Sequence, residues 1–412
     1  MQRLNQKTIS WTYTTLIWIL FIGMMWSRAM LSIGVVVLPV FTLLVHLKKI
    51  KIVFKQRSWV WSMVLMFLIA VVSLIWSTDP SEAMPSLMNK TMLVFIPIGL
   101  LGAPLKNLQW TLKTLFGIAV IHIIVMVGVG VEYISNPEQW IAWYNQMGTM
   151  PVAKYNDHIR FTLSLILLNV IWMRTVLTKP LLVFHRFWKT STIIFAGISV
   201  LFIHLLASKS GIVLLYLSLI LWILFLIPQW KAKLIVFIGA VLLLISMFQW
   251  SPTFRKKVDM VKYQWDLFQE SGTLDYNNSD QGRVISYKVA WQTLQESPML
   301  GVGLGAELKE MKQHYQERYP EIPEDRYIVP HNQFLFSFLS FGCILGAFYV
   351  LLLAIPVFYK KTEVNKLELL VLFVIFASFI PEATLEAQFG MFIVVFYLSW
   401  LRFVESKSIH FE

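Results

Sequence analysis

Apolar residues follow one another in this chain in long blocks, many of them close to the roughly 20 residues with which an α-helix crosses a bilayer. Of the 412 residues, 57% are hydrophobic and only 14% carry a charge. The blocks lack the alternation of apolar and polar residues that a membrane β-barrel shows over about ten residues. The sequence therefore predicts an all-α polytopic membrane protein.

We predict twelve membrane spans from these blocks. The first is expected to be a span and not a signal peptide, because no small-residue cleavage site follows it. The fourth is interrupted by Pro97 and Pro104. The single cysteine, Cys343, excludes an intrachain disulfide. The predicted spans cover about residues 9–26, 30–47, 59–76, 88–104, 114–134, 160–178, 191–207, 211–228, 233–250, 331–356, 367–381 and 388–403.

Four basic loops set the predicted orientation. They lie on the same side as both chain termini, and the positive-inside rule assigns that side to the cytoplasm. The opposite side holds a loop at 135–159 and a large, partly helical loop at 251–330. The large loop separates an N-terminal membrane region (1–250) from a C-terminal one (331–412). The basic loops are 48–57, 178–189, 229–233 and 359–366.

The formal net charge of +12 does not indicate a nucleic-acid partner. The large outer loop holds 10 Lys and Arg against 12 Asp and Glu, a net charge of −2, so the basic excess belongs to the membrane regions. There it favours contact with anionic membrane lipids.

Two stretches of the large loop space their apolar residues as amphipathic helices do. We expect both helices to lie against the membrane surface or to cap the spans. The segment 272–282 between them, GTLDYNNSDQG, is polar and typical of turns. The apolar positions are Phe254, Val258, Val261, Trp265 and Phe268 in 251–271, and Val284, Tyr287, Ala290 and Leu294 in 282–297.

Three polar residues that could take part in catalysis or binding lie at the predicted outer boundary of the membrane. Lys209 lies at the tip of a two-span hairpin, Arg283 follows Gly282 at the start of a loop helix, and His331 opens the tenth span. Each also has a purely structural interpretation. Lys209 could be an interfacial anchor, Arg283 a solvated loop residue, and His331 or Asn332 a helix cap.

Further polar residues lie on the same side. His158 and Arg160 stand at the entrance to the sixth span, where they could bind an anion or anchor the interface. Glu382 and Glu386 could pair with Lys209 or Arg283, or simply form a polar turn. The remaining acids that could bind a divalent cation, although loop acids usually just hydrate, are Asp79, Glu82, Asp275 and Asp280.

No cofactor is predicted. The stretch GVGLG at 301–305 lacks the Gly-Lys-Ser ending of a P-loop and is interpreted as a tight turn. His-x-x-x-His, Asp-x-Asp and paired-cysteine patterns are missing from the sequence, so no metal site is expected.

The order of three motifs resembles the O-antigen ligase and polymerase superfamily of bacterial envelopes. SKSG is followed by GRVISYKVAWQTLQESPMLGVGLG and then by HNQFLFSFLSFGCILG, over about residues 200–350. The family usually has Arg at the first motif, where this chain has Lys209. Lysine keeps the charge but not the bidentate fork. The matching residues are Gly282, Arg283, Trp291, Pro298, Gly301, Gly303, His331, Asn332 and Gly342.

The resemblance implies a glycosyltransferase of the GT-C type in the bacterial inner membrane, with cytoplasmic termini and a periplasmic active site. The donor would be a glycan on undecaprenyl diphosphate, and the acceptor a sugar hydroxyl such as that of lipid A–core. Lys209 and Arg283 would hold the diphosphate without a metal, and His331 would act as base in an inverting reaction. The substrate-binding candidates are Asn332, Arg160, His158, Glu382 and Glu386.

Other functions remain open. A polymerase of the same superfamily, or a protein O-oligosaccharyltransferase, would need the same diphosphate clamp and base and would differ in its acceptor groove. A polysaccharide transporter or flippase belongs to another class. It is expected to place charges or broken helices at mid-membrane and often to have two related halves, whereas the candidates here lie at the outer edge.

Overall fold

The computed structural model describes residues 5–46, 59–105, 107–145, 148–155, 157–178, 185–271, 276, 279–359 and 365–405. Within these ranges all regular structure is helical, so the predicted all-α class is confirmed. Each predicted span falls on one helix or on consecutive helices. These are α1 (Gln6–Trp26), α2 (Arg28–His46), α4 (Val60–Val72) with η2 (Ser73–Ile75), α5 (Met84–Lys90) with α6 (Met92–Leu100), α7 (Leu108–Ser135), α9 (His158–Thr178), α10 (His185–Leu206), α11 (Lys209–Leu226), α12 (Trp230–Trp250), α16 (Gln333–Leu351) with η4 (Leu352–Ala354) and α17 (Ile355–Phe358), α18 (Lys366–Ser378) and α19 (Gln388–Glu405).

Eight of the described helices are long and apolar enough to cross a membrane. Three more predicted spans fall on shorter apolar helices, Val60–Ile75, Met84–Leu100 and Gln388–Phe403. The one remaining predicted span, 367–381, falls on α18. The chain is thus a multi-pass membrane protein, while the number of twelve crossings stays a prediction. The basic loop 48–57 and parts of 178–189 and 359–366 lie outside the described residues.

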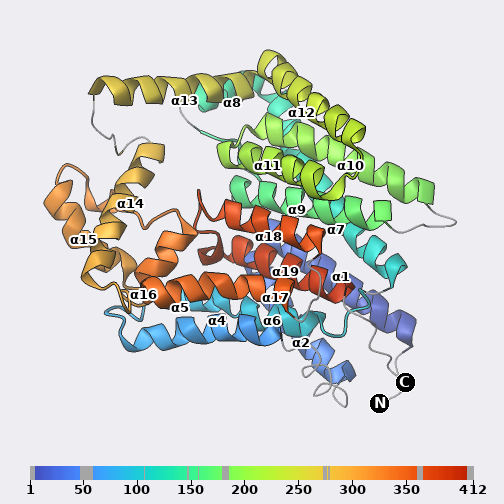
Figure 1. Ribbon diagram of the computed structural model, residues 1–412, viewed down its shortest axis with the longest axis horizontal. Coiled ribbons are helices and arrows are strands. Elements are labelled where there is room, and N and C mark those ends of the chain that lie inside the picture. Colours follow the sequence, from blue (N-terminus) through green and yellow to red (C-terminus); the bar gives the residue numbers. More distant parts are fainter. Residues whose placement is uncertain are drawn as a thin grey trace.

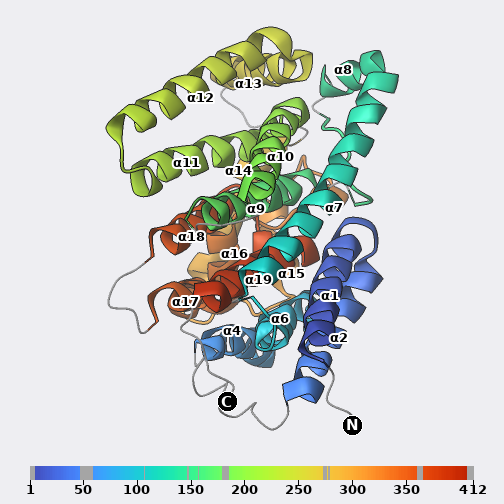
Figure 2. The ribbon, with the colours of Figure 1, turned by 90° about the vertical axis from the view of Figure 1, so that its right-hand side faces the viewer.

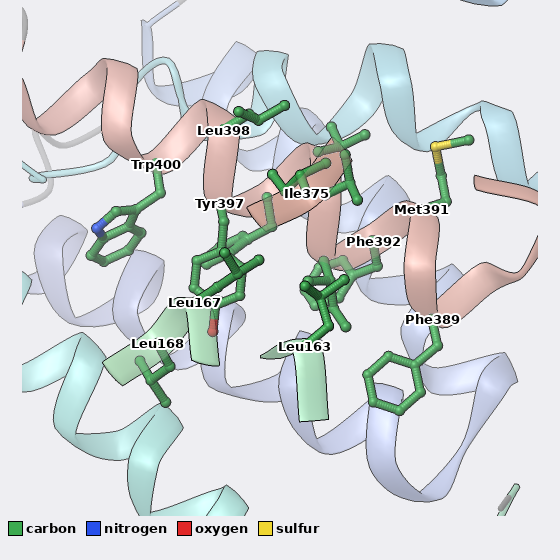
Figure 3. Packing of buried hydrophobic residues seen from close by; sticks show 14 of the residues in the cluster. Leu163, Leu167, Leu168, Ile375, Phe389, Met391, Phe392, Tyr397, Leu398 and Trp400 are labelled. Carbon is green, nitrogen blue, oxygen red and sulfur yellow. The ribbon is translucent and has the colours of Figure 1, made fainter. Parts of the chain in front are cut away.

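Helix α19 forms the centre of the bundle. Every side chain from Met391 to Leu401 is buried, which is the pattern of a helix surrounded by protein on all sides. It contacts α6, α9 and α18, and Figure 2 shows it enclosed by its neighbours. Figure 3 shows Phe392 and Tyr397 facing leucines of α9.

Helix α12 is the opposite case. It is largely apolar after Lys233, yet none of its residues is buried, and it lies at the edge of the molecule in Figure 2. A contiguous exposed apolar surface of this size needs an apolar environment. A membrane supplies one, so α12 has the character of a lipid-facing span.

The two loops predicted to face outward fold into helices of their own, α8 (Pro137–Asn145), α13 (Pro252–Ser271), α14 (Ser279–Glu296), α15 (Glu307–Arg318) and η3 (Glu324–Arg326). In Figure 1, α14 and α15 lie together at the end of the molecule opposite the start of α1. They share a small core in which Ile285 and Val289 of α14 pack with Met311 and Tyr315 of α15 and with Leu339 of α16. The large loop is therefore held against the tenth predicted span.

Helix α14 differs from its prediction in two respects. It begins at Ser279, so the last four residues of the expected turn segment are helical. Asp280 in its first turn favours this start, because an acid stabilises the positive end of the helix dipole. The buried face carries Ile285 and Val289, whereas Val284, expected on that face, is 40% exposed.

Helix α16 is broken at Gly342, whose φ of 78° and ψ of 167° are not helical. The amide of Cys343 donates to the carbonyl of Pro298 (2.9 Å). The helix carbonyls at Leu339 and Ser340 accept instead from the amides of Val302 (2.8 Å) and Gly303 (3.0 Å). The glycine-rich turn at 301–305 thus fills the break with its own backbone hydrogen bonds, satisfying groups that the helix leaves open.

Glu307 closes this junction. Its carboxyl oxygens accept from the Ser340 hydroxyl (2.5 Å) and from the amide of Gly305 (2.9 Å). The side chain is almost completely buried, and burial raises its pKa to about 7. An acid at this depth holds the loop to α16 through hydrogen bonds in either protonation state.

Substituting Gly342 tests this junction. A Cβ at Gly342 would lie 2.1 Å from the carbonyl oxygen of Met299, in a backbone region that costs other residues about 1–3 kcal/mol. Gly342→Ala should therefore lower the unfolding temperature of the detergent-purified protein clearly. The control is Gly239→Ala in α12, where a Cβ meets no atom within 4 Å. Equal unfolding temperatures for the two variants would contradict the proposed junction.

Candidate functional site

The start of α16 is bonded to the loop 379–387 between α18 and α19. Asn332 caps the helix by accepting from the amide of Leu335 (3.0 Å) and donates to the carbonyl of Ile380 (3.0 Å). The backbone amide of the buried Gln333 donates to the carbonyl of Phe379 (2.9 Å), and its side-chain oxygen accepts from the backbone amide of Leu385 (2.7 Å). These bonds fix the residue before the cap, His331, beside the same loop.

His331 faces Glu382 from across this junction. Its Nδ1 lies 3.2 Å from Oε1 of Glu382. An ionised carboxylate can only accept, so Nδ1 carries the proton, and Nε2 is left as the acceptor of a neutral imidazole. The side chain of His331 is 34% exposed, whereas that of Glu382 is 7% exposed. The arrangement can orient an imidazole to remove a proton from a bound group.

Tyr287 of α14 supports this position from the other side. Its hydroxyl donates to the backbone carbonyl of His331 at 2.9 Å. The bond ties the outer loop directly to the residue that faces Glu382.

Two arginines share the Glu382 carboxylate with His331. Arg160 of α9 lies 2.9 Å from Oε1 and also pairs with Asp157 (3.1 Å). Arg283 of α14 lies 3.7 Å from Oε2. Burial alone raises the pKa of Glu382, but the hydrogen bond from His331 and the charges of Arg160 and Arg283 outweigh burial, and the pKa is lowered. The carboxylate is therefore ionised at neutral pH.

Lys209 joins this group through the first turn of α14. It opens α11, where a cation is disfavoured by the helix dipole, and its ammonium pairs with Asp280. Asp280, Arg283 and Tyr287 are spaced by three and four residues, so their side chains share one face of α14. That face meets Lys209, Glu382 and the His331 carbonyl in turn.

We name these residues the outer polar cluster: Lys209, Asp280, Arg283, Arg160, Asp157, Glu382 and His331. Its three permanent cations are each paired with a carboxylate. An anionic ligand would thus bind by exchange with a carboxylate. The two pairs best suited to exchange are Lys209–Asp280, whose side chains are 34% and 49% exposed, and Arg283–Glu382, the longest contact.

Glu386 lies apart from this cluster. It pairs with the fully buried Lys90 at 2.5 Å, accepts from Ser86 (2.8 Å) and accepts from Gln333 (3.1 Å). The expectation that Glu386 meets Lys209 or Arg283 is therefore wrong, whereas Glu382 does meet Arg283. The pair of Glu386 with Lys90 joins the break between α5 and α6 to the loop 379–387, which is a structural role.

The other predicted candidates take simpler positions. His158 is half-buried at the first turn of α9. Asn332 acts as a helix cap. Of the acids considered for a metal, Asp79 accepts from Ser81 (2.7 Å), Asp280 pairs with Lys209, and Asp275 lies outside the described residues. Across the part of the chain that the structure describes, no group of three or more His, Cys, Asp or Glu side chains could hold a metal ion.

Sequence reasoning missed three contributors to the site. Gln333 stands beside His331 and Asn332, and only its complete burial reveals that it fixes the junction. Asp157 precedes Arg160 by one helical turn, a spacing that could have indicated the ion pair. Tyr287 was counted as an apolar position, although a tyrosine at a helix face often places its hydroxyl on a polar partner.

The family comparison agrees with the motif order. A family model described as O-antigen ligase matches residues 194–350, which include α11, α13, α14, α15 and most of α16. The match confirms the resemblance to the O-antigen ligase and polymerase superfamily over this part of the chain. A search of curated proteins finds no match.

Glu382 gives the outer polar cluster a specific dependence on pH. Because its pKa is lowered from 4.5, the ionised carboxylate stabilises the folded state fully above pH 4.5, and this contribution is lost as the pH falls through the lowered pKa. Glu382→Gln should cost about 1.5–3 kcal/mol above that pH. The difference in unfolding temperature from wild type should shrink on further acidification.

The control for this measurement is Glu321→Gln, an exposed glutamate in the same outer region, which should match wild type at each pH. If the unfolding temperature of Glu382→Gln stays below that of wild type by the same amount between neutral pH and pH 3, the carboxylate does not carry the interaction.

Proposed function

We propose, because residues 194–350 match a family model described as O-antigen ligase, that the chain is a glycosyltransferase that moves a glycan from undecaprenyl diphosphate to a sugar hydroxyl of lipid A–core. The reaction takes place at the periplasmic face of the bacterial inner membrane. The observation that carries the proposal is the outer polar cluster, which combines an oriented imidazole with three cations at one end of the bundle.

The proposed step is a single displacement. The acceptor hydroxyl oxygen attacks the anomeric carbon, the bond from that carbon to the diphosphate oxygen breaks, and undecaprenyl diphosphate leaves with the electron pair. The hydroxyl proton passes to Nε2 of His331, while Glu382 holds the proton on Nδ1 and stabilises the imidazolium that forms. Attack opposite the leaving group inverts the anomeric centre. The donor bond supplies the energy, so no nucleotide is consumed.

The leaving diphosphate needs positive charge at the point where its own charge develops. Lys209 of α11 contacts the start of α14 through its ion pair with Asp280. Arg283 lies in α14 itself, three residues after Asp280, so both cations are at the start of this helix. The diphosphate replaces Asp280 at Lys209 and Glu382 at Arg283, whose contact is the looser one at 3.7 Å. Arg160, held by Asp157, keeps Glu382 ionised and in place during this exchange.

A reconstituted transfer assay tests the proposal. Purified protein in nanodiscs receives an undecaprenyl-diphosphate glycan and lipid A–core, with excess EDTA. We expect the full-length glycan to appear on the acceptor and undecaprenyl diphosphate to be released. Glycan that grows on the lipid carrier instead would identify a polymerase, and strict dependence on Mg²⁺ or Mn²⁺ would contradict the metal-free clamp.

His331→Ala should abolish most transfer while leaving the protein folded, because Asn332, and not His331, caps α16. The expected loss of turnover is about 10²–10⁴-fold, the range for a general base. A matched control is His314→Ala, which removes another histidine paired with a glutamate (Nε2 to Glu296, 3.2 Å) in the same outer loop. Wild-type turnover by well-folded His331→Ala would remove this residue from the mechanism.

Lys209 and Arg283 should respond differently when each is replaced by the other basic residue. Lys209→Arg should retain substantial activity, whereas Lys209→Ala should lose about 2.7–4 kcal/mol of transition-state stabilisation, the value of one oxyanion contact. Arg283→Lys should cost more than Lys209→Arg, because it loses the bidentate fork. The measurement is kcat/KM for the lipid-diphosphate donor.

Asp280→Asn separates charge from structure in this series. It breaks the same ion pair as Lys209→Ala but leaves the cation, so it should be much less damaging. If Asp280→Asn and Lys209→Ala lose activity equally, the ion pair matters for folding only, and Lys209 does not bind the donor.

A further inference from the structure

An open cavity of about 570 Å³ lies beside Lys209, between the start of α11 and one face of α13. Ile212 and Val213 line it from α11, and Val258 and Val261 line it from α13. Val213 is 65% exposed and Val261 is 43% exposed. An apolar surface of this kind inside a cavity is suited to an apolar ligand.

Lysines frame this apolar surface. Lys209 lines the cavity from α11, and Lys257 and Lys262 line it from α13. Lys257 donates to the carbonyl of Gly148 (3.4 Å) and lies 6.0 Å from the centre of the Tyr144 ring. Burial, and next the nearby charge of Lys209, lower the pKa of Lys257, while Asp280 opposes this effect. Lys209, Lys257 and Asp280 thus form one electrostatic group at the edge of the cavity.

The start of α11 adds to the attraction for an anion. Ser208 precedes the helix without a side-chain cap hydrogen bond, so the first amides of α11 are not satisfied by that hydroxyl. Amides and dipole at a helix start favour negative charge. The combination of apolar walls, lysines and a helix start fits a ligand that has an anionic head and a long apolar tail.

We propose that this cavity binds the isoprenoid units next to the diphosphate of the lipid carrier, and that Lys257 positions the diphosphate together with Lys209. The inference rests on the proposed function, which supplies the diphosphate at Lys209. Lys209 belongs both to the outer polar cluster and to the cavity wall, so a single ligand can reach from one to the other. The apolar chain then leaves between α11 and α13 while the sugar faces His331.

The experiment measures binding of undecaprenyl diphosphate without sugar to the protein in nanodiscs. Val258→Trp fills the cavity and should weaken binding about tenfold, and Lys257→Ala should weaken it by about the same factor. Binding of inorganic diphosphate should fall in Lys257→Ala but stay unchanged in Val258→Trp, because only the lipid uses the apolar walls. Val261→Trp is a second cavity-filling variant in case Val258→Trp does not fold.

Each variant has a matched control. Val241 in α12 has the same 40% exposure as Val258 and does not line the cavity, so Val241→Trp should bind as wild type. Lys256 precedes Lys257 and is exposed on another side of α13, so Lys256→Ala should also bind as wild type. Unfolding temperatures confirm that all variants are folded.

Three results would overturn the inference. Val258→Trp and Val261→Trp could bind undecaprenyl diphosphate with wild-type affinity, Lys257→Ala could do so, or phosphatidylglycerol could displace the ligand as well as undecaprenyl diphosphate does. If these variants keep full affinity and wild type transfers glycan, the cavity assignment fails and the proposed function stands. If the variants weaken binding but wild type transfers no glycan, the cavity assignment stands and the proposed function fails.

Discussion

The site depends on one buried carboxylate, that of Glu382. It accepts from His331 and pairs with Arg160 and Arg283, residues that come from α9, α14 and the start of α16. Arg160 and Arg283 would repel one another in a partly buried space without an anion between them. Glu382 therefore holds both arginines at one end of the bundle and also selects the tautomer of His331 that can accept a proton.

Backbone hydrogen bonds give this carboxylate its fixed surroundings. The break of α16 at Gly342 lets the turn at 301–305 dock on the helix, and α14 packs with α15 on the same surface. Helix α14 can then present Asp280, Arg283 and Tyr287 to three different partners. The glycines of the outer loop therefore act through the fold, and they serve the site by positioning α14.

The sequence could predict what depends on neighbouring residues. Apolar blocks placed a helix at each expected span, and the glycines at 301–305 were correctly interpreted as a turn. Partners distant in the chain were not accessible, since Arg160 and Glu382 are 222 residues apart. Helix α15 was missed because ELKEMKQHYQER is polar along most of its length, and its only buried apolar side chains are Met311 and Tyr315.

A structure of the protein with the bound donor, determined by cryo-electron microscopy in nanodiscs, tests the central claim most directly. The account predicts the diphosphate within hydrogen-bond distance of Lys209 and Arg283, with Arg283 released from Glu382. It also predicts that Nε2 of His331 faces the anomeric carbon from the side opposite the diphosphate. A diphosphate bound elsewhere, with the contacts of Lys209 to Asp280 and of Arg283 to Glu382 unchanged, would contradict it.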